Sequence, residues 1–363
     1  MRDQIENIEL SIRKISEKAE NYDCVRLDIG QPSFDTPEHV KQAAKNVLSE
    51  KQGYTSTKGI EKLRSAVAKE ECSKDGVDFD KEDVMITTGG MGALYAVFAA
   101  ELDKDSKAVF DDPCWGPYKL ISEVNGNNWS QVEYFGEDGL RDEAKEELRE
   151  ADLAVVTTPD NPTGRVLEKS EAREIAEFCK ENDTLMISDE VYHCLTYGKK
   201  HVSPARFNDD SIIIGSVSKN HAMTGWRIGW LASNHDVDNY AKVNRAMTAS
   251  PNKIGQLAAI KALKNRSHVE EMRSEYEERA ELVKERMDQL GWSYQDPDGA
   301  IYAFPNVGRD SWSFCLEMIE KGVAMVPGEP FGDECDQNVR IAFGAATKEE
   351  LDKAFDILEE ELN

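Results

Sequence analysis

Residues that could hold a phosphate and react with an aldehyde stand close together in one short segment. Ser216, Ser218, Lys219 and Arg227 follow one another there within a few positions. Hydroxyls and a guanidinium suit a phosphate dianion. A partly desolvated lysine amine loses its proton more readily, which suits a Schiff base with an aldehyde. The residue types therefore predict a ligand site here, against the alternative of a solvated loop with one basic residue.

The segment follows the apolar, β-branched run of residues 211–215, which predicts a buried strand. Open α/β sheets bind their ligands where such strands end. Gly225 and Gly229 would let the backbone turn sharply beyond the strand. We therefore expect the polar residues to face a crevice at a sheet edge.

Four further apolar runs predict strands that end in polar or glycine-rich turns: residues 84–88, 108–110, 153–157 and 184–188. After the first run, Gly90 and Met91 precede a helix expected over residues 93–102. Free N–H groups at a helix start form a second device for phosphate. The spacing is not the Gly-x-Gly-x-x-Gly of dinucleotide sites. The other runs are followed by Trp115, Asn161 and Asp189. The alternatives to a ligand-binding role are, in the same order, an indole in the core, an ordinary turn and a helix cap.

An arginine lies inside another apolar run, residues 338–344. Arg340 would be costly to bury without an anionic partner. An internal Asp or Glu is the simplest partner that the sequence can offer.

The pattern Ser-x-Ser-Lys-x5-Gly-x-Arg-x-Gly at residues 216–229 resembles the cofactor-lysine motif of the class I and II aminotransferases. These are fold type I enzymes of pyridoxal 5'-phosphate. The chain is most similar to the aspartate aminotransferase subgroup of bacteria and archaea. The resemblance extends from about Asp28 to Gly344, and the separate motifs occur in the order of the family.

The resemblance implies a role for each matching residue. Lys219 would hold the cofactor aldehyde and transfer the substrate proton, and Asp189 would keep the pyridine nitrogen protonated. The cofactor-binding residues would be Tyr54, Gly90, Met91, Trp115, Asn161, Asp189, Tyr192, Ser216, Ser218, Lys219 and Arg227. The substrate would contact Gly30, Trp115, Asn161 and Arg340, with Arg340 gripping the α-carboxylate. Tyr54 would reach the cofactor phosphate of the other subunit in a homodimer.

The implied fold is α/β, with a mostly parallel large-domain sheet flanked by helices and a smaller α+β domain. We expect residues 1–40 to form an N-terminal arm and part of the small domain. Residues 41–270 would form the large domain and residues 271–363 the small C-terminal domain. The expected elements include helices over 1–22 (with Ile5, Ile8, Ile12 and Ile15 on one face), 59–70 and 268–290, and strands near 27–29, 299–305, 323–328 and 338–344.

The resemblance implies transamination between an L-amino acid and a 2-oxo acid, with 2-oxoglutarate as the expected acceptor. The donor stays open between aspartate-type, aromatic and broader use. Relatives specific for aspartate can carry a lysine where Met91 stands, and methionine cannot grip a distal carboxylate. A β-lyase of the same fold and a non-catalytic pyridoxal-phosphate-binding protein remain alternatives.

Composition restricts the partners. The chain of 363 residues has 44 Lys and Arg against 70 Asp and Glu, a formal net charge of −26. Such a charge disfavours nucleic acid and anionic membranes as partners. Seven scattered cysteines without a Cys-x-x-Cys pair favour reduced thiols and a cytoplasmic protein. The resemblance implies a role in amino-acid metabolism. The six histidines show no metal-ligand spacing, so we expect no metal site.

Overall fold

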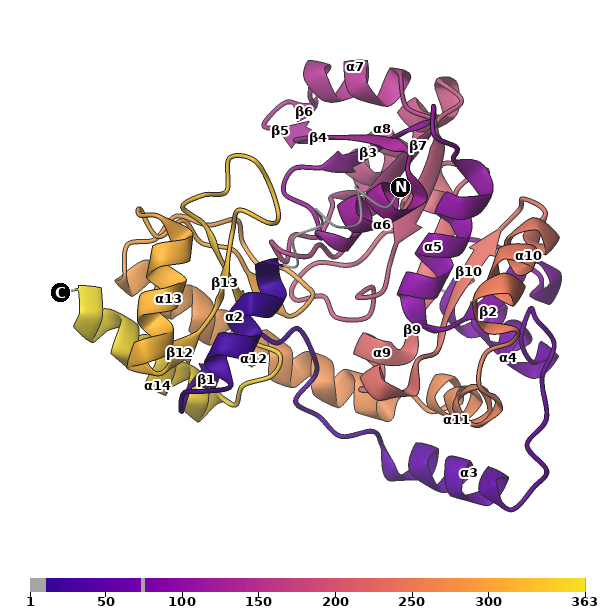
Figure 1. Cartoon of the computed structure of the whole chain (residues 1–363), viewed down its shortest axis with the longest axis horizontal. Helices are drawn as coiled ribbons and strands as arrows, with labels where there is room; N and C mark the ends of the chain where they lie inside the picture. The colour runs from indigo at the N-terminus through magenta and orange to yellow at the C-terminus, as the bar shows by residue number, and fades with distance from the viewer. Residues whose placement is uncertain (1–10, 73–75, 363) are drawn as a thin grey trace.

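A twisted seven-stranded sheet with helices on both faces forms the larger part of the molecule (Figure 1). The computed structural model describes residues 11–72 and 76–362. The sheet runs in the order β2 (Val84–Thr87), β10 (Gly229–Ser233), β9 (Ile212–Ser216), β8 (Leu185–Asp189), β7 (Leu153–Thr157), β3 (Lys107–Asp111) and β4 (Asn128–Val132). β10 is antiparallel to both of its neighbours, and the pairs from β9 to β4 are parallel. The predicted α/β fold with a mostly parallel sheet is therefore confirmed.

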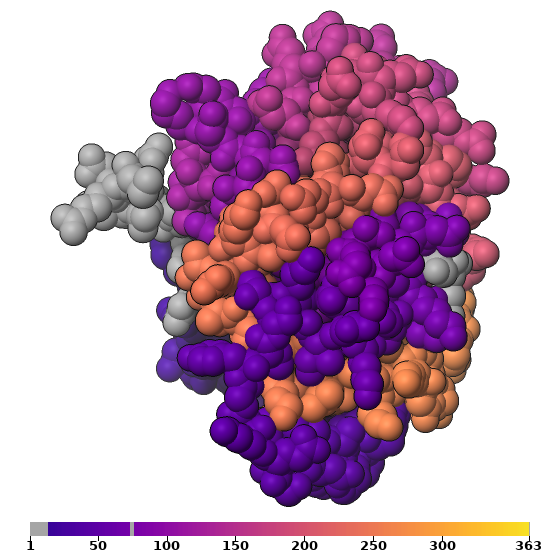
Figure 2. Space-filling view, turned by 90° about the vertical axis from the view of Figure 1, so that its right-hand side faces the viewer, coloured from indigo at the N-terminus to yellow at the C-terminus, as the bar shows by residue number. Residues whose placement is uncertain are grey.

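Alternate residues of the central strands face opposite layers of helices, as the period of a strand requires. Ile213 and Trp230 pack with α3 (Glu38–Leu48), α4 (Glu61–Val67) and α11 (Lys253–Lys264). Ile212, Ile214 and Leu231 pack on the other face with α5 (Gly89–Glu101), α6 (Pro117–Asn125) and α10 (Val237–Thr248). Figure 2 shows the purple N-terminal segment lying directly against the orange segment of α10 and α11, although the two are far apart in the chain.

A third group of core residues covers one face of β3, β7 and β8. α7 (Asp142–Arg149) and α8 (Lys169–Glu181) pack there against Val109, Ala154 and Met186. A small hairpin of β5 (Phe135–Gly136) and β6 (Gly139–Leu140) lies beside them. Burial of these apolar side chains on both faces is the main stabilising contribution to such a sheet.

Segments from both ends of the chain build the smaller part of the molecule. α12 (Ser267–Gln289), α13 (Ser311–Lys321) and α14 (Lys348–Leu362) surround a sheet in the order β11 (Tyr302–Ala303), β14 (Val339–Ala342), β13 (Val326–Pro327). β1 (Val25–Arg26) pairs in parallel with β12 (Val323–Ala324), and α2 (Ser11–Ala19) packs beside them. Figure 1 shows the indigo N-terminal elements lying among the orange and yellow C-terminal ones. The domain boundaries proposed from the sequence stay a prediction.

Several expected elements differ from those in the structure. The helix expected from residue 93 begins at Gly89, so the glycine-rich stretch is its first turn. The strand expected near 27–29 ends at Arg26, and the run 323–328 divides into β12 and β13, which pair in different sheets. Only Tyr302 and Ala303 of the run 299–305 pair as a strand.

The expected helices agree more closely. The helix expected over 59–70 is α4 followed by a π-helical turn, Ala68–Cys72. The helix expected over 268–290 is confirmed as α12. Of the N-terminal apolar stripe, Ile15 is buried, whereas Ile5 and Ile8 lie outside the described residues.

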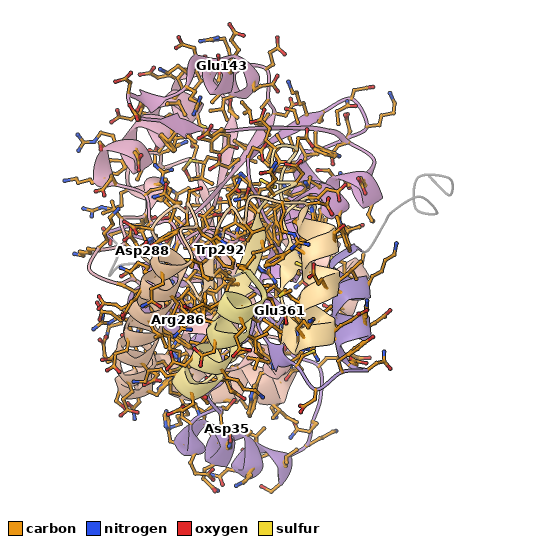
Figure 3. The ribbon with its side chains drawn as sticks, turned by 90° about the vertical axis from the view of Figure 1, so that its left-hand side faces the viewer. Asp35, Glu143, Arg286, Asp288, Trp292 and Glu361 are labelled. Atoms are coloured by element: carbon orange, nitrogen blue, oxygen red, sulfur yellow. The ribbon has the colours of Figure 1, made fainter. Side chains whose placement is uncertain are left out.

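Acidic side chains such as Asp35, Glu143 and Glu361 are exposed and point outward (Figure 3). The acidic charge is thus spread over a solvated surface. In the part of the chain that the structure describes, none of the helices has the length and apolar character needed to cross a lipid bilayer.

Candidate functional site

The carboxyl ends of β3, β7, β8 and β9 open into a cavity of about 1560 Å³ that also borders the smaller sheet. Every site residue predicted from the sequence lines this cavity, with the exception of Tyr54. Those lining residues are Gly30, Gly90, Met91, Trp115, Asn161, Asp189, Tyr192, Ser216, Ser218, Lys219, Arg227 and Arg340. The structure thus brings together residues that are spread over most of the chain.

Lys219 lies in the short helix α9 (Val217–Asn220), which begins directly at the end of β9. Ser216 caps this helix, because its Oγ accepts a hydrogen bond of 2.9 Å from the backbone N of Ser218. The amine of Lys219 donates to the backbone O of Gly30. Burial lowers the pKa of Lys219, and the charges of Arg340 and Arg227 lower it further against an opposing effect of Tyr302. A neutral amine that can accept a proton is therefore accessible here.

One corner of the cavity is built for an anion. Gly90 and Met91 lie in the first turn of α5, where no side chain caps the helix, and the amide groups of a first turn have no partners within their helix. Arg227 has a left-handed backbone, with φ 55°, and Nη1 donates to the backbone O of Thr224 over 2.9 Å. A Cβ on Gly89 would lie 2.3 Å from Nη2 of Arg227, so only glycine lets the guanidinium approach the helix start this closely.

A buried carboxylate lies at the floor of the cavity. Asp189 ends β8 and is 2% exposed. Tyr118 donates to Asp189 Oδ2 over 2.7 Å, and the backbone N of Val191 donates to Oδ1 over 3.3 Å. Burial raises the pKa of Asp189 to about 6, against the opposing effect of the Tyr118 hydrogen bond. The carboxylate is therefore mostly ionised at neutral pH, at a cost that a cationic partner would offset.

The sequence reasoning did not identify Tyr118. It lies one helical turn beyond Trp115, and the two rings make an edge-on contact with centroids 5.4 Å apart. Its hydroxyl also lies 2.9 Å from Thr157 Oγ1. The only signal in the sequence was a second aromatic residue three positions after Trp115.

Tyr302 was also missed. Its hydroxyl lies 2.8 Å from the hydroxyl of Tyr192, and both residues are buried. A Cβ on Gly30 would lie 2.3 Å from the Tyr302 hydroxyl, which explains why a glycine stands there. These contacts join the segment after β1, the segment after β8 and β11 at one side of the cavity.

Arg340 is 5% exposed and forms no ion pair with any residue in the ranges 11–72 and 76–362. Nη1 donates to Asn161 Oδ1 over 3.2 Å and Nη2 to the backbone O of Asp28 over 3.1 Å. Nε has no hydrogen-bond partner among the described residues. The carboxylate of Asp28 is already paired with Arg26 at 2.7 Å. An internal Asp or Glu partner, the alternative to a substrate carboxylate, is therefore not found among the described residues, and a buried cation faces the cavity.

Tyr54 is the exception. Its side chain is 92% exposed and borders a different, shallow hollow on the surface. A large aromatic ring in this position has little to pack on within its own chain.

Known proteins resemble this chain over nearly its whole length. Residues 22–358 match the family model described as Aminotransferase class I and II. An aromatic-amino-acid aminotransferase 2 from Thermococcus litoralis is 35% identical, and the alignment covers 99% of this chain and 97% of that protein. A probable aspartate aminotransferase from Methanocaldococcus jannaschii is 32% identical, with 96% of each chain covered. Among solved structures, an aspartate aminotransferase from Thermus thermophilus with maleate superposes with a TM-score of 0.92 at 32% identity, covering 99% of this chain and 98% of that one.

Proposed function

This chain belongs to the class I and II aminotransferases, which are pyridoxal-phosphate enzymes, and we propose from this which of its residues perform each part of transamination. The observation that carries the proposal is the placement of two groups on one cavity: the amine of Lys219, whose pKa burial lowers, and the buried guanidinium of Arg340, which has no carboxylate partner among the described residues.

The residues fit pyridoxal phosphate. The uncapped start of α5 and the guanidinium of Arg227 would hold the phosphate, and Gly89 leaves the space that this corner needs. The hydroxyl of Ser216 would join them by turning from the backbone O of Ile228, to which it donates over 3.2 Å. Asp189 would pair with the ring nitrogen, whose positive charge offsets the cost of burying the carboxylate.

Lys219 would hold the aldehyde. The NH₂ group of Asn161 and the hydroxyl of Tyr192 are donors for the phenolic oxygen, since Asn161 Oδ1 is engaged by Arg340. Trp115 would stack on the ring, and Ser218 would complete the cofactor contacts.

When bound, the cofactor supplies an aldehyde that exchanges amino groups and a protonated ring that withdraws electrons from the substrate. The chain supplies the positioned proton carrier. Lys219 would take a proton from Cα of the substrate as a neutral amine and return it as an ammonium, which is general acid–base catalysis by one group. Its hydrogen bond to Gly30 O holds the amine at the side of the cavity that Arg340 also faces.

Arg340 would grip the α-carboxylate that every amino-acid donor carries. Its free Nε and its fork of nitrogens suit a two-point contact with a planar anion. The rings of Tyr302 and Phe331 lie 4.7 and 5.1 Å from its guanidinium carbon and fix its plane. Gly30, Trp115 and Asn161 would complete the contacts with the substrate.

Replacing Arg340 by lysine should lower kcat/KM for all amino-acid donors by a similar factor. A lost charged hydrogen bond is worth roughly 1.5–3 kcal/mol, which corresponds to a fall of about ten- to over a hundredfold. Steady-state kinetics with aspartate, phenylalanine and alanine would measure it. Arg286→Lys is the matched control, because Arg286 of α12 (labelled in Figure 3) pairs with Asp356 and is not among the residues that line the cavity. A loss confined to one class of donor would show that Arg340 contacts side chains instead.

The names of the relatives and the lining of the cavity bear on the amino-group donor and acceptor. The relatives include proteins named as aspartate and as aromatic-amino-acid aminotransferases. We infer an aspartate- or aromatic-type donor and 2-oxoglutarate as acceptor. Met91 lines the cavity at the start of α5 and offers no charge to a distal carboxylate, so strict use of dicarboxylic donors is not favoured.

A donor screen with 2-oxoglutarate tests this, on the native chain and on Met91→Lys. We expect product 2-oxo acid without free ammonia, and a Met91→Lys variant whose preference for aspartate over phenylalanine rises at least about tenfold through a new charged contact. Leu316→Lys, an exposed apolar residue of α13, is the control. Release of ammonia in step with the oxo acid would favour the β-lyase alternative.

We also infer a homodimer, because the exposed ring of Tyr54 would be buried if it reached the cavity of a second copy. A cytoplasmic location is the accompanying proposal. None of the seven cysteines, all of which lie in the described residues, forms a disulfide, which is usual for proteins of a reducing compartment.

A further inference from the structure

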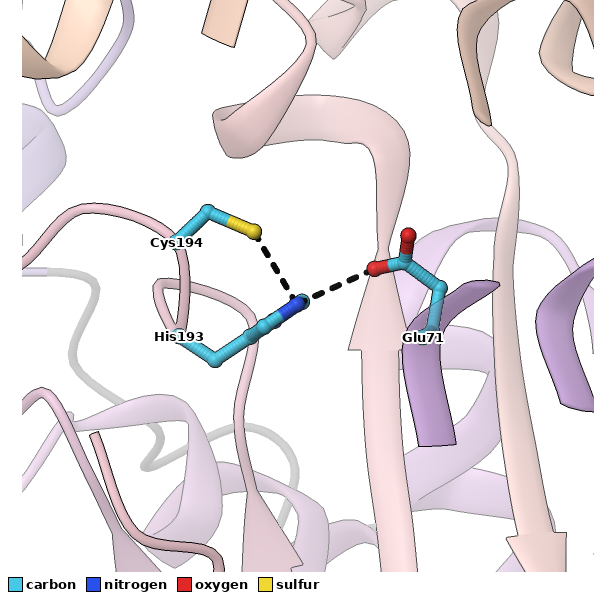
Figure 4. A group of neighbouring side chains, drawn as sticks. All are labelled: Glu71, His193 and Cys194. Carbon is cyan, nitrogen blue, oxygen red and sulfur yellow. Dashed lines mark hydrogen bonds and ion pairs between the residues drawn. The ribbon is translucent and has the colours of Figure 1, made fainter. Parts of the chain in front are cut away.

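Glu71, His193 and Cys194 form a group of possible metal ligands outside the cavity (Figure 4). Glu71 lies in the π-helical turn after α4, and His193 and Cys194 lie in the turn after β8. In Figure 4 the three side chains point toward one another, and their donor atoms lie within 4.8 Å of one another. The spacing of the histidines, from which no metal site was expected, does not record such a meeting of distant segments.

The carboxylate of Glu71 has one oxygen without a partner. Its side chain is 3% exposed, and Oε1 accepts a hydrogen bond of 2.7 Å from Arg266 Nη1. Oε2 lies 3.1 Å from His193 Nε2, yet it has no hydrogen-bond partner among the described residues. Leaving a buried polar atom in this state is costly, and it indicates an ion or a water molecule at that point.

The opposite ring nitrogen of His193 has acceptors of its own. Nδ1 lies 2.8 Å from the backbone O of Glu190, which can accept its proton. Nδ2 of Asn220 lies 3.2 Å from Nδ1 while Oδ1 of the same amide has no partner, so turning the amide would give Nδ1–H a second acceptor. A proton held at Nδ1 leaves the lone pair of Nε2 free in the neutral ring. Histidines that ligate metals are commonly oriented in this way.

We propose that Glu71, His193 and Cys194 bind one zinc ion through Oε2, Nε2 and Sγ. A carboxylate, an imidazole and a thiolate form a donor set that suits zinc, whereas magnesium and calcium prefer oxygen alone. With bond lengths of about 2.0–2.3 Å, the donor atoms of a tetrahedral zinc site lie about 3.3–3.6 Å apart. Nε2 lies 3.1 Å from each of the other two donors, and those two lie within 4.8 Å of each other, so modest side-chain rotations would close the site. Water would take the fourth position, and the partial exposure of Cys194 gives the ion a path from solvent.

Arg266 is a cation that could oppose the zinc ion. Nη1 donates to Glu71 Oε1, and Nη2 donates to Cys194 Sγ. Neither contact occupies Oε2 or Nε2, and a metal-bound thiolate still has lone pairs for an N–H donor. The charges of zinc, the Glu71 carboxylate and the Cys194 thiolate sum to zero. The guanidinium would therefore face a neutral group and orient two of its ligands from outside.

A proton is the other competitor for His193 Nε2. Burial opposes a charged ring, but Cys194 and Glu71 raise the pKa of His193 well above its usual value. The thiol of Cys194 must also lose its proton to bind the metal. Zinc binding should therefore release protons, and the affinity should be at least about tenfold lower at about pH 6 than at about pH 8.

The test uses Co²⁺ as a spectroscopic substitute for zinc, with cofactor-loaded protein that has been dialysed against a chelator. We expect one equivalent of Co²⁺ to give the ligand-field absorption of a tetrahedral site in the red, where the cofactor does not absorb, and Zn²⁺ to abolish it. Cys194→Ser should weaken binding at least about a hundredfold, because the loss of an outer-shell partner alone typically costs about 10- to 100-fold. Cys24→Ser is the matched control, since Cys24 is also partly exposed but lies outside the group.

Glu71→Gln keeps the size of the side chain and removes the anionic ligand, so it should also weaken Co²⁺ binding. If this variant does not fold, the native titration and Cys194→Ser decide. Absence of the red absorption, an unchanged titration in Cys194→Ser or an affinity that does not vary with pH would overturn the zinc site. None of these outcomes bears on transamination, because none of the three ligands lines the cavity.

Discussion

Lys219→Ala is expected to lower kcat by about 10⁴-fold while the protein still folds and still takes up pyridoxal phosphate. The variant removes the amine that we propose takes and returns the Cα proton, and positioned proton transfer contributes a factor of about 10² to 10⁴ on its own. The loss of its role in holding the aldehyde adds to that effect. Phosphate binding should persist, because α5, Ser216 and Arg227 are unchanged. Single-turnover kinetics and the visible spectrum of the loaded protein measure both quantities.

Two controls separate chemistry from folding in this experiment. The melting temperature should stay close to that of the native protein, because the amine contributes one hydrogen bond, to Gly30 O. Borohydride treatment of the native protein should attach the cofactor permanently to the peptide containing Lys219. Attachment to any other lysine, or near-native turnover in the variant, would remove Lys219 from the catalytic role.

The sequence allowed the edge of the sheet that carries the site to be predicted, because local patterns determine it. The parallel strands β3, β7, β8 and β9 each contain a short apolar run with a polar turn after it. Asp189 and Ser216 are the last residues of their strands, and Asn161 lies in the turn after β7. In a parallel sheet these ends must meet at one edge, so their proximity follows from the strand assignment. The resemblance then added the roles.

Contacts between distant segments could not be predicted in this way. Tyr118 and Asp189 are 71 positions apart, and Tyr192 and Tyr302 are 110 apart, yet each pair shares a hydrogen bond. No periodicity records which buried hydroxyl will meet which carboxylate.

The pairing of the short strands in the smaller part of the molecule could not be predicted from the sequence either. The apolar run at 323–328 reads as one strand, but its first two residues pair with β1 and Val326–Pro327 pair with β14. The change of partner depends on where the N-terminal segment returns to the C-terminal part. Composition within the run carries no sign of it, so only the presence of a strand was predictable.

The burial of Asp189 links its ionisation to the stability of the fold. An aspartate whose pKa rises on folding binds a proton more tightly in the folded than in the unfolded state. Its ionisation therefore destabilises the fold as pH rises from about 4 to about 6, and this cost persists above that range. The shift from 3.8 to about 6 corresponds to a cost on the order of 3 kcal/mol at neutral pH in the absence of a cationic partner.

Asp189→Asn should therefore lower turnover without lowering the stability of the cofactor-free protein. The cofactor-free variant should be at least as stable as the native chain at neutral pH, since the amide removes the buried charge and its oxygen can still accept from Tyr118. Turnover should fall by about 10²-fold or more, because a neutral amide does not hold the proton on the ring nitrogen, and an electrostatic contact of this kind is worth about 3 kcal/mol or more. Thermal unfolding of the cofactor-free protein at about pH 5 and pH 7, with kcat of the loaded one, gives both values.

Asp35→Asn, a change on the exposed surface, is the control. If the variant kept native kcat, Asp189 would be only a structural residue at the end of β8. If it lost stability without cofactor, the cost of burial would have been compensated by the protein itself, and the pairing of Asp189 with the ring would lose its physical basis.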